Sequence, residues 1–259
     1  MNRRELANQF YNAYKNQQHT SLISNQELEI DVAEAYQIQR ELNHLKVKHD
    51  KEEVIGYKIS MTSEEMQRVV GKSNEPAYGT FTTNSLLKEN IHLHPNAPLL
   101  LEPELVFILQ EDLSAEADHK EIIQKSKIAA GLEVPSSRYP NWFPFNEEVK
   151  LVDIIADNAF AGYIHIGKPM EIPASIDWEN IHARLFFNEQ KLDEGTSKEV
   201  LGNPLNAVSW LNQKLHQQQQ SLKRGMAISS GTFTDPVQLQ KGIYQVEFDL
   251  LGQLSLTVG

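Results

Sequence analysis

The sequence predicts a mixed α+β fold. Apolar residues repeat at helical spacing through the first fifty residues, whereas the alternation typical of strands closes the chain. The segments between them are typical of hairpins rather than of regular strand–helix repeats, which disfavours a doubly wound sheet. We therefore expect one compact unit, made of an N-terminal helical segment, residues 1–52, and a β-rich core, residues 53–259.

The N-terminal segment is expected to contain two amphipathic helices. Leu6, Phe10 and Tyr14 recur every four residues and define the first helix. The second has apolar residues at spacings of three and four, which are Val32, Ala35, Ile38, Leu42 and Leu45.

The core is expected to begin with a strand, EVIGYKIS at residues 53–60, that carries Lys58. Thr62 and Glu65 fit a capping box, which predicts a helix near Ser63 to Val70.

Two buried strands should follow. The run LLLEPELVFIL, residues 99–109, is apolar on both faces apart from its two glutamates, which is typical of a strand buried on both sides. Asp118 and Glu121 predict the cap of a helix that ends before a second apolar segment, residues 128–134.

The segment after Trp142 should lead as a loop through residues 149–158 to a strand at residues 162–166. The run ARLFFNEQKL, residues 183–192, predicts a hairpin that turns near Asn188.

The chain should end with a helix and a hairpin. Asn203 followed by Pro204 is a favourable N-cap and first-turn pair for the helix. Apolar and polar residues then alternate over residues 244–250 and 254–258, with a turn at Gly252 between them.

Composition excludes several classes of protein. The 259 residues include 35 acidic and 24 basic side chains, for a formal net charge of −11, and no cysteine. An acidic excess disfavours nucleic-acid binding, and the lack of thiols excludes disulfides and thiolate metal sites. No run is long and apolar enough for a membrane span or a signal peptide, so we expect a soluble, cytoplasmic protein.

Glu102 and Glu104 are the most unusual candidates for a functional site. Residues two apart on a strand point to the same face, so both carboxylates should converge within an apolar segment. Pro103 between them cannot donate to a β-ladder and indicates a strand end or a bulge. The alternative is that both glutamates lie at a solvent-exposed edge or pair with Lys and Arg.

A third acidic residue, Glu133, lies in the apolar run IAAGLEVP. Three buried carboxylates are costly unless they are paired, and a bound cation is the simplest compensation. Hard oxygen ligands favour Mg²⁺ or Mn²⁺ over soft metals. The sequence therefore predicts a divalent metal site formed by Glu102, Glu104 and Glu133.

Lys58 is the second candidate. Burial in the strand-rich core would lower its pKa and make the amine available for proton transfer. The alternative is a packed stem whose ammonium group reaches water.

A weaker metal hypothesis combines His92 and His94 with Glu102 or Glu104. The sequence contains no G-x-S-x-G, P-loop, G-x-G-x-x-G or HExxH motif, so the usual nucleophile, nucleotide and zinc-protease interpretations lack support.

Several segments together resemble one family. GYKISMTS is similar to the G-W-K-I-G-L-T-S segment of the 2-keto-4-pentenoate hydratase family, in the fumarylacetoacetate hydrolase superfamily, which also contains 2-oxo-3-hexenedioate decarboxylases. EPAYGTF, LEPELVFIL, GLEVPSSR, ADNAFAG, GNPLNAVSWLNQKL and SSGTFTDP match further family segments in order. The resemblance extends from about Asp31 to the C-terminus.

The resemblance implies a mixed β-roll core with helices packed outside and a ring-like homo-oligomer. It also implies that Glu102, Glu104 and Glu133 bind Mg²⁺ or Mn²⁺, that Lys58 is the family's strand lysine, and that Gly231 and Thr232 form the turn lining the substrate site.

The implied reaction is the hydration of a small anionic substrate, a 2-hydroxy-2,4-dienoate or its 2-oxo-4-enoate tautomer, during catabolism of aromatic-derived compounds. The substrate would chelate the metal through its carboxylate and 2-oxygen, Lys58 would move a proton during ketonisation, and Thr232 would hold a carboxylate or hydroxyl group. The product would be a 4-hydroxy-2-oxo acid.

Two positions depart from the family pattern, since an acidic residue is common at the positions of Ala77 and Ser136. If either carboxylate positions the attacking water, its loss would slow or abolish hydration, or redirect the chain to another substrate.

Three alternative functions remain open. The first is 2-oxo-3-hexenedioate (4-oxalocrotonate) decarboxylation, and the second is acylpyruvate hydrolysis, which would need a general base such as His19, His44 or His49. The third is a non-catalytic binding subunit.

Overall fold

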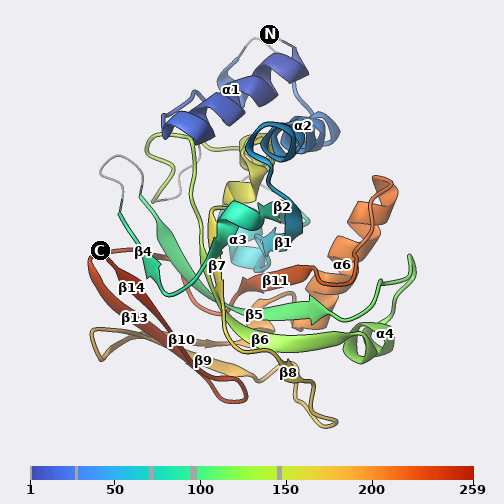
Figure 1. The fold of residues 1–259 in the computed structure, drawn as a ribbon, viewed down its shortest axis with the longest axis vertical. Coiled ribbons are helices and arrows are strands. Elements are labelled where there is room, and N and C mark those ends of the chain that lie inside the picture. The colour runs from blue at the N-terminus through green and yellow to red at the C-terminus, as the bar shows by residue number, and fades with distance from the viewer. Residues whose placement is uncertain (1, 27–28, 70–72, 94–97, 145–147) are drawn as a thin grey trace.

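Helices and two β-sheets make up the part of the chain that the computed structural model describes, residues 2–26, 29–69, 73–93, 98–144 and 148–259. The predicted α+β class is confirmed. In Figure 1 the N-terminal helices lie at the top, long strands cross the middle, and the smaller sheet lies at the lower left.

The larger sheet has nine strands, and seven of them follow the order β2-β1-β11-β5-β6-β7-β3. Strand β12 pairs with β5, and β8 pairs with β6. The bounds are β1 Val54–Ser60, β2 Ala77–Thr82, β3 Leu86–Leu87, β5 Leu100–Leu109, β6 Ser126–Val134, β7 Tyr163–Ile166, β8 Met170–Glu171, β11 Ala227–Thr232 and β12 Val237–Gln238.

The smaller sheet has five strands in the order β10-β9-β13-β14-β4. Their bounds are β4 Asn90–Ile91, β9 His182–Phe187, β10 Gln190–Thr196, β13 Gly242–Phe248 and β14 Gly252–Val258. Both predicted hairpins are present. Asn188 and Glu189 have positive φ angles at the β9–β10 turn, and Gly252 has a φ of +72° at the β13–β14 turn.

Six α-helices and four 3₁₀ helices surround the sheets within the described ranges. Their bounds are α1 Arg3–Asn16, α2 Val32–Asp50, α3 Glu64–Val69, α4 His119–Gln124, α5 Leu151–Ala156, α6 Pro204–Gln217, η1 Ile23–Asn25, η2 Thr83–Ser85, η3 Asn158–Phe160 and η4 Ser197–Glu199.

Side-chain caps explain where most of the longer helices begin. Asn2 and Asp31 form capping boxes at α1 and α2, and Asp118 and Asn203 accept backbone N–H groups at α4 and α6. These side chains satisfy N–H groups that would otherwise lack partners.

The predicted cap of α3 was wrong by one residue. The Ser63 Oγ, rather than the Thr62 hydroxyl, accepts the Met66 N–H at 3.2 Å. Helix α3 ends at Val69, and Val70 lies outside the described residues.

The loop predicted over residues 149–158 was also wrong, because this segment contains α5 and the start of η3. The Asp153 carboxylate accepts the Lys150 N–H at 2.9 Å, and Ile154 and Ile155 are buried. The short helix therefore forms through a local cap and core packing, although its sequence has little helical periodicity.

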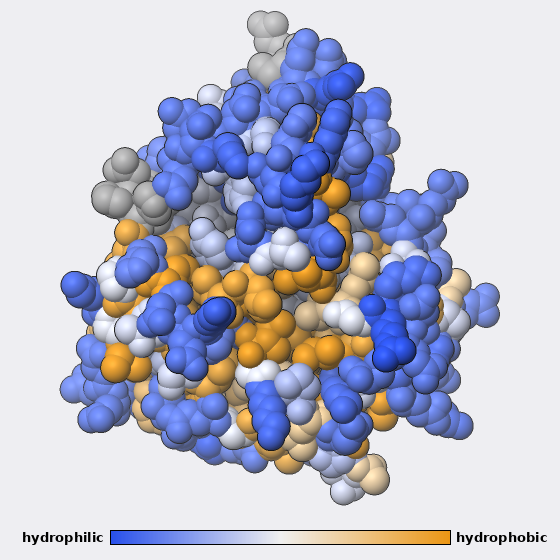
Figure 2. Space-filling view, viewed as in Figure 1, coloured by the Kyte–Doolittle hydropathy of each residue, from blue (hydrophilic) through white to orange (hydrophobic). Residues whose placement is uncertain are grey.

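The N-terminal helices share one apolar core with the sheets, which includes Leu6, Phe10 and Ile38. The Gln39 amide on α2 donates to the backbone oxygens of Tyr78 and Ile155 and so ties α2 to β2 and α5. In Figure 2 polar residues cover the N-terminal helices, whereas apolar residues gather over the middle of the same face. No helix among the described residues is both long enough and apolar enough to cross a bilayer.

Candidate metal centre and cavity

Four adjacent strands, β1, β11, β5 and β6, carry the residues that the sequence singled out. These residues are Lys58, Gly231, Thr232, Glu102, Glu104 and Glu133. The register pairs Glu102 directly with Glu133, and Lys58 with Ser229 of the intervening strand β11. Because paired and alternate residues share a face, Lys58 and the three glutamates point to the same side of the sheet.

The three glutamates form a compact cluster. One carboxylate oxygen from each of Glu102, Glu104 and Glu133 lies within 4.8 Å of the other two. Glu104 and Glu133 are completely buried, and Glu102 is partly exposed. The alternative that Glu102 and Glu104 lie at a solvent-exposed edge is therefore wrong for Glu104, whereas Glu102 does pair with a lysine, Lys58.

An apolar patch continues the face that carries the carboxylates. Val106 and Ile108 follow Glu104 at alternate positions on β5 and pack in a small apolar cluster with Phe81 and Ile164. The glutamates thus lie at one end of an apolar surface, where water cannot screen their charges effectively.

A β-bulge on β11 holds one of the glutamates. The pairing register between β11 and β5 shifts between Ser229 and Thr232, as the position of Pro103 indicated. Gly231 lies within this bulge with a φ of +119°, and its N–H donates to the Glu104 Oε2 at 2.9 Å. A Cβ at Gly231 would lie 2.5 Å from the Thr62 Oγ1, so this position requires glycine.

Lys58 is buried beside the carboxylates. Its Nζ lies 2.7 Å from the Glu133 Oε2 and 3.9 Å from the Glu102 Oε2. Only 1% of the residue is exposed, so the alternative in which its ammonium group reaches water is wrong.

The pKa of Lys58 is raised, contrary to the sequence-based prediction. Burial lowers this pKa, but the nearby charges of Glu133, Glu102 and Glu104 raise it by more. The predicted lowering considered burial alone, since only the folded register shows how close the three carboxylates lie.

The two fully buried carboxylates, Glu104 and Glu133, have raised pKa values. Burial, and then the charge of Glu102, raises the pKa of Glu104 to about 7 against the opposing effect of Lys58. Burial likewise raises the pKa of Glu133 well above its ordinary value. Ionisation of all three carboxylates at once is therefore unfavourable in this cluster.

The donor set fits a hard divalent cation. One ammonium group faces three carboxylates, which leaves two negative charges when all four groups are ionised. The Oε1 atoms of Glu104 and Glu133 are buried and have no hydrogen-bond partner. Such oxygens, next to a cavity that admits further ligands, are what Mg²⁺ or Mn²⁺ requires.

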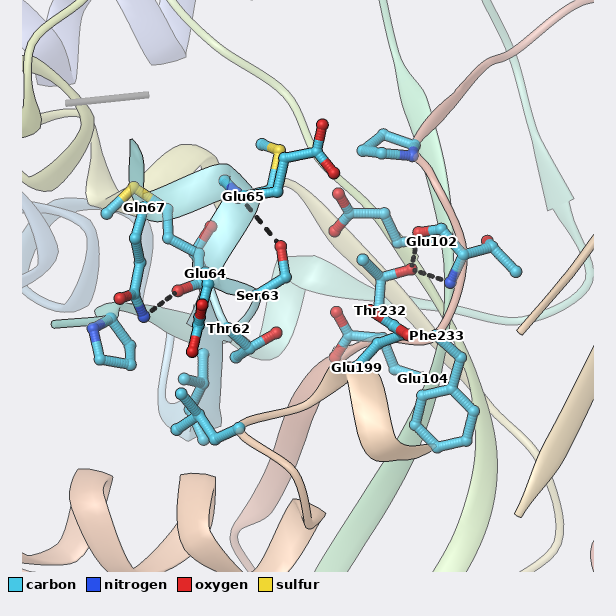
Figure 3. A pocket seen from close by; sticks show the side chains of 18 of the residues that line it. Thr62, Ser63, Glu64, Glu65, Gln67, Glu102, Glu104, Glu199, Thr232 and Phe233 are labelled. Carbon is cyan, nitrogen blue, oxygen red and sulfur yellow. Dashed lines mark hydrogen bonds between the residues drawn. The ribbon is translucent and has the colours of Figure 1, made fainter. Parts of the chain in front are cut away.

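A cavity of about 1120 Å³ lies against this cluster. Figure 3 shows Glu102, Glu104, Thr232 and Phe233 on one side of it and residues of α3 on the other. Lys58 and Glu133 are buried behind the lining residues. The cavity would therefore bring a bound molecule against the oxygens of Glu102 and Glu104.

Thr232 lines the cavity, but its hydroxyl group is engaged locally. The Oγ1 donates to the Thr234 backbone oxygen at 2.9 Å and accepts the Thr234 N–H at 3.3 Å. The hydroxyl would have to exchange at least one of these bonds to contact a substrate.

The histidine-based hypotheses gain no support from the described residues. His92 is exposed and does not belong to the carboxylate cluster, and His94 lies outside the described residues. His19, His44 and His49 are exposed and do not line the cavity.

The two departures from the family pattern lie near the cavity but do not line it. Ala77 is buried in β2, paired with the lining residue Ser60. Ser136 forms an isolated bridge with Leu99.

Several residues that line the cavity were not predicted from the sequence. Phe160 and Trp210 form apolar walls, and Glu65 and Glu199 contribute carboxylates. These residues are far apart in sequence and belong to several different elements. The ADNAFAG and GNPLNAVSWLNQKL segments, which contain the two aromatic residues, were the one available signal.

Comparisons with known proteins support the predicted resemblance. No profile of a known protein family matches the chain. The chain is 29% identical over 257 residues to 2-oxo-hept-4-ene-1,7-dioate hydratase of Escherichia coli, a match that covers 96% of this chain and 95% of the relative. It is also 29% identical to 2-keto-4-pentenoate hydratase of Burkholderia vietnamiensis (strain G4 / LMG 22486), over 88% of this chain and 86% of the relative.

The fold is also similar to a solved structure, 4-oxalocrotonate decarboxylase from Pseudomonas putida G7 complexed with magnesium and adipate. The TM-score is 0.90 at 22% identity, and the match covers 99% of this chain and 97% of that chain. The resemblance predicted from the sequence segments is confirmed by these relatives, and the predicted α+β fold is confirmed by the structural similarity.

Proposed function

We propose that this chain belongs to the 2-keto-4-pentenoate hydratase and 2-oxo-hexenedioate decarboxylase family and is a metal-dependent hydro-lyase. It would add water to a 2-hydroxy-2,4-dienoate, or to its 2-oxo-4-enoate tautomer, and yield a 4-hydroxy-2-oxo acid in the catabolism of aromatic-derived compounds. One observation carries the proposal, namely that three glutamates and a buried lysine form one cluster, of which Glu102 and Glu104 line a large cavity.

Glu102, Glu104 and Glu133 would hold Mg²⁺ or Mn²⁺. The two buried, unpartnered carboxylate oxygens and the excess negative charge support this assignment. When bound, the cation would supply Lewis-acid polarisation of the substrate's carboxylate and 2-oxygen.

Lys58 would move a proton as the dienol becomes the 2-oxo form. Its ammonium group is 2.7 Å from Glu133, so it is held in one place and kept charged by the carboxylates. Neutralising those carboxylates would weaken the attraction, and burial would then favour the neutral amine. The same side chain could therefore release and recover a proton within the site.

Gly231 would act by positioning Glu104. Its N–H already donates to this carboxylate, so it fixes one proposed metal ligand rather than the substrate. Thr232 would contact the substrate from the cavity wall, after one of its bonds to Thr234 is exchanged.

The proposal is tested by incubating the purified protein with Mg²⁺ and 2-hydroxypenta-2,4-dienoate or 2-hydroxyhexa-2,4-dienedioate. Formation of a 4-hydroxy-2-oxo acid, detected by mass spectrometry, supports the hydratase. Release of CO₂ without a hydrated product would instead establish a decarboxylase. This is the second candidate because a relative that is 28% identical is named 4-oxalocrotonate decarboxylase.

The hydrolase and the binding subunit have their own readouts. Cleavage of an acylpyruvate would establish the hydrolase, and metal binding without turnover of any of these acids would establish a binding subunit.

Three properties predicted from the sequence stay predictions. They are the cytoplasmic location, the homo-oligomeric state, and the division of the chain into a helical segment, residues 1–52, and a core, residues 53–259.

A further inference from the structure

We infer that the cavity selects an acid whose far end is uncharged, so that it accepts monocarboxylic 2-oxo-4-enoates and rejects dicarboxylic ones. This inference rests on the proposed function, and it narrows the substrate to one class. A preference for monocarboxylic acids would distinguish this chain from the similar Escherichia coli protein, whose name specifies a 1,7-dioate.

The cavity lining is strongly acidic. Among the described lining residues there are nine carboxylates and one cationic side chain, Lys198. Glu102 and Glu104 belong to the proposed metal centre. The other seven carboxylates are Glu64, Glu65, Glu75, Asp193, Glu194, Glu199 and Asp235.

Three of these seven are balanced by ion pairs. Glu75 pairs with Lys214 at 2.8 Å, and Glu194 pairs with Lys191 at 3.1 Å. Glu64 pairs with Arg68 at 3.7 Å. Each pair places a cation beside its carboxylate, so these three residues add less negative charge to the lining than the other four.

The other four carboxylates have no Lys or Arg ion pair within the described ranges. Asp193 accepts backbone N–H groups, from Glu194 and Asp235. Glu65, Glu199 and Asp235 are exposed residues of the lining, and Glu65 and Glu199 are labelled in Figure 3. Against these four, Lys198 supplies one positive charge, so the lining remains negative.

One part of the wall suits an apolar tail, although other lining residues are uncharged polar ones. Ile154, Phe160 and Trp210 line the cavity together with Met61 and Met66. Such side chains offer contact area and no hydrogen-bond donor to a carboxylate, apart from the indole N–H. A hydrocarbon tail would gain from burial here, whereas a charged one would lose its hydration.

The positively charged groups can bind a carboxylate at only one end of the substrate. The proposed cation and Lys58 lie at the carboxylate cluster, where the 2-oxo acid group would bind. A second carboxylate on the tail would face the acidic lining instead, and like charges in a partly enclosed cleft repel more strongly than in bulk water.

The test compares two saturated acids of equal chain length, 2-oxohexanoate and 2-oxohexanedioate, whose binding in the presence of Mg²⁺ is measured by calorimetry. The same comparison is made for turnover with 2-hydroxyhexa-2,4-dienoate and 2-hydroxyhexa-2,4-dienedioate. We expect the dicarboxylic member to be weaker by at least about tenfold at low salt. The difference should shrink at about 0.5 M NaCl, where the screening length falls to about 4 Å.

A double variant assigns the effect to the lining. Glu65→Gln with Glu199→Gln removes two unpaired charges and should bring the two acids closer in affinity and in kcat/KM. The control, Glu116→Gln, removes an exposed carboxylate that does not line the cavity and should leave the ratio unchanged.

Equal or tighter binding of the dicarboxylic acid, or a ratio insensitive to both salt and the double variant, would overturn the inference. Failure of the proposed function looks different, because neither dienoate would then be hydrated while the two saturated acids still report the selectivity of the cavity. Absence of binding by both saturated acids would overturn the inference as well.

Discussion

Lys58 and Glu133 form a buried ion pair, Nζ to Oε2 2.7 Å, across two intervening strands of the larger sheet. The lysine spans this distance above Ser229 of β11, with which it is in register. Ser229 lies on the same face as Lys58, and its small side chain leaves room for the lysine. The pair therefore depends on the sheet order β1–β11–β5–β6 and links the candidate proton carrier to a candidate metal ligand.

Replacing Lys58 should separate catalysis from metal binding. Lys58→Ala should lower kcat by about 10²-fold or more, because no other described amine lies at the cluster to move the proton. Removing one partner of a buried pair should also cost about 3–5 kcal/mol of stability in the absence of metal.

Mg²⁺ should restore much of the stability of Lys58→Ala, since a cation can replace the lost ammonium charge. Calorimetry with Mg²⁺ and urea unfolding with and without the metal check this prediction. Near-normal turnover by the variant would remove Lys58 from the mechanism, and loss of Mg²⁺ binding together with turnover would indicate a structural role.

Stability without metal should fall as pH rises through the range set by Glu104. Its pKa is raised to about 7 in the folded chain and has an ordinary value of 4.5. Between these values the folded protein binds more protons than the unfolded chain, so this contribution is complete below about 4.5 and is lost as pH approaches and passes about 7.

Glu104→Gln is the matched variant, because it removes the charge and keeps an oxygen that can accept the Gly231 N–H. Near pH 8 with EDTA it should be more stable than the wild type by roughly 3 kcal/mol, with little advantage near pH 5. Added Mg²⁺ should stabilise the wild type more than the variant. The free energy of unfolding of both proteins should be measured by urea unfolding across this pH range. If it changes with pH in the same way for both, the pKa of Glu104 does not cause the loss of stability.

A methyl group at Gly231 should disturb both the bulge and Glu104. Gly231→Ala would combine a φ of +119° with a Cβ only 2.5 Å from the Thr62 Oγ1, at a cost of about 1–3 kcal/mol or more. Mg²⁺ affinity should also fall, because the Gly231 N–H holds the Glu104 carboxylate.

Gly225→Ala is the control for backbone strain, since this glycine has a φ of +86° and its Cβ would have no neighbouring atom within 4 Å. It should lose stability but keep Mg²⁺ affinity. Combining Gly231→Ala with Thr62→Ala should recover part of the lost stability. If Gly225→Ala lowers Mg²⁺ affinity as much as Gly231→Ala does, the specific link from Gly231 to Glu104 is wrong.

The sequence predicted the elements and residues whose signal is local. Glu102, Glu104 and Glu133 stand out because each interrupts an apolar run, and the helix caps at Asp118 and Asn203 follow from short spacings. Alternation on the last strands and the turn at Asn188 are equally local.

Features that depend on strand order could not be read from the sequence. The raised pKa of Lys58 requires that only two strands separate β1 from β6, and no spacing in the chain encodes that distance. Helix α5 forms against the core despite weak periodicity, and Phe160 and Trp210 line one cavity only because the fold brings η3 and α6 to it. The acidic lining likewise comes from segments more than a hundred residues apart.

The central claim is that Glu102, Glu104 and Glu133 hold one divalent cation. Its most direct test is calorimetric titration of the EDTA-treated protein with Mg²⁺ and Mn²⁺, for the wild type, Glu102→Ala and the control Glu111→Ala, which removes an exposed carboxylate just beyond the end of β5. We predict one site per chain in the wild type and in Glu111→Ala, and an affinity at least about a hundredfold lower in Glu102→Ala. Unchanged affinity in Glu102→Ala would contradict the account.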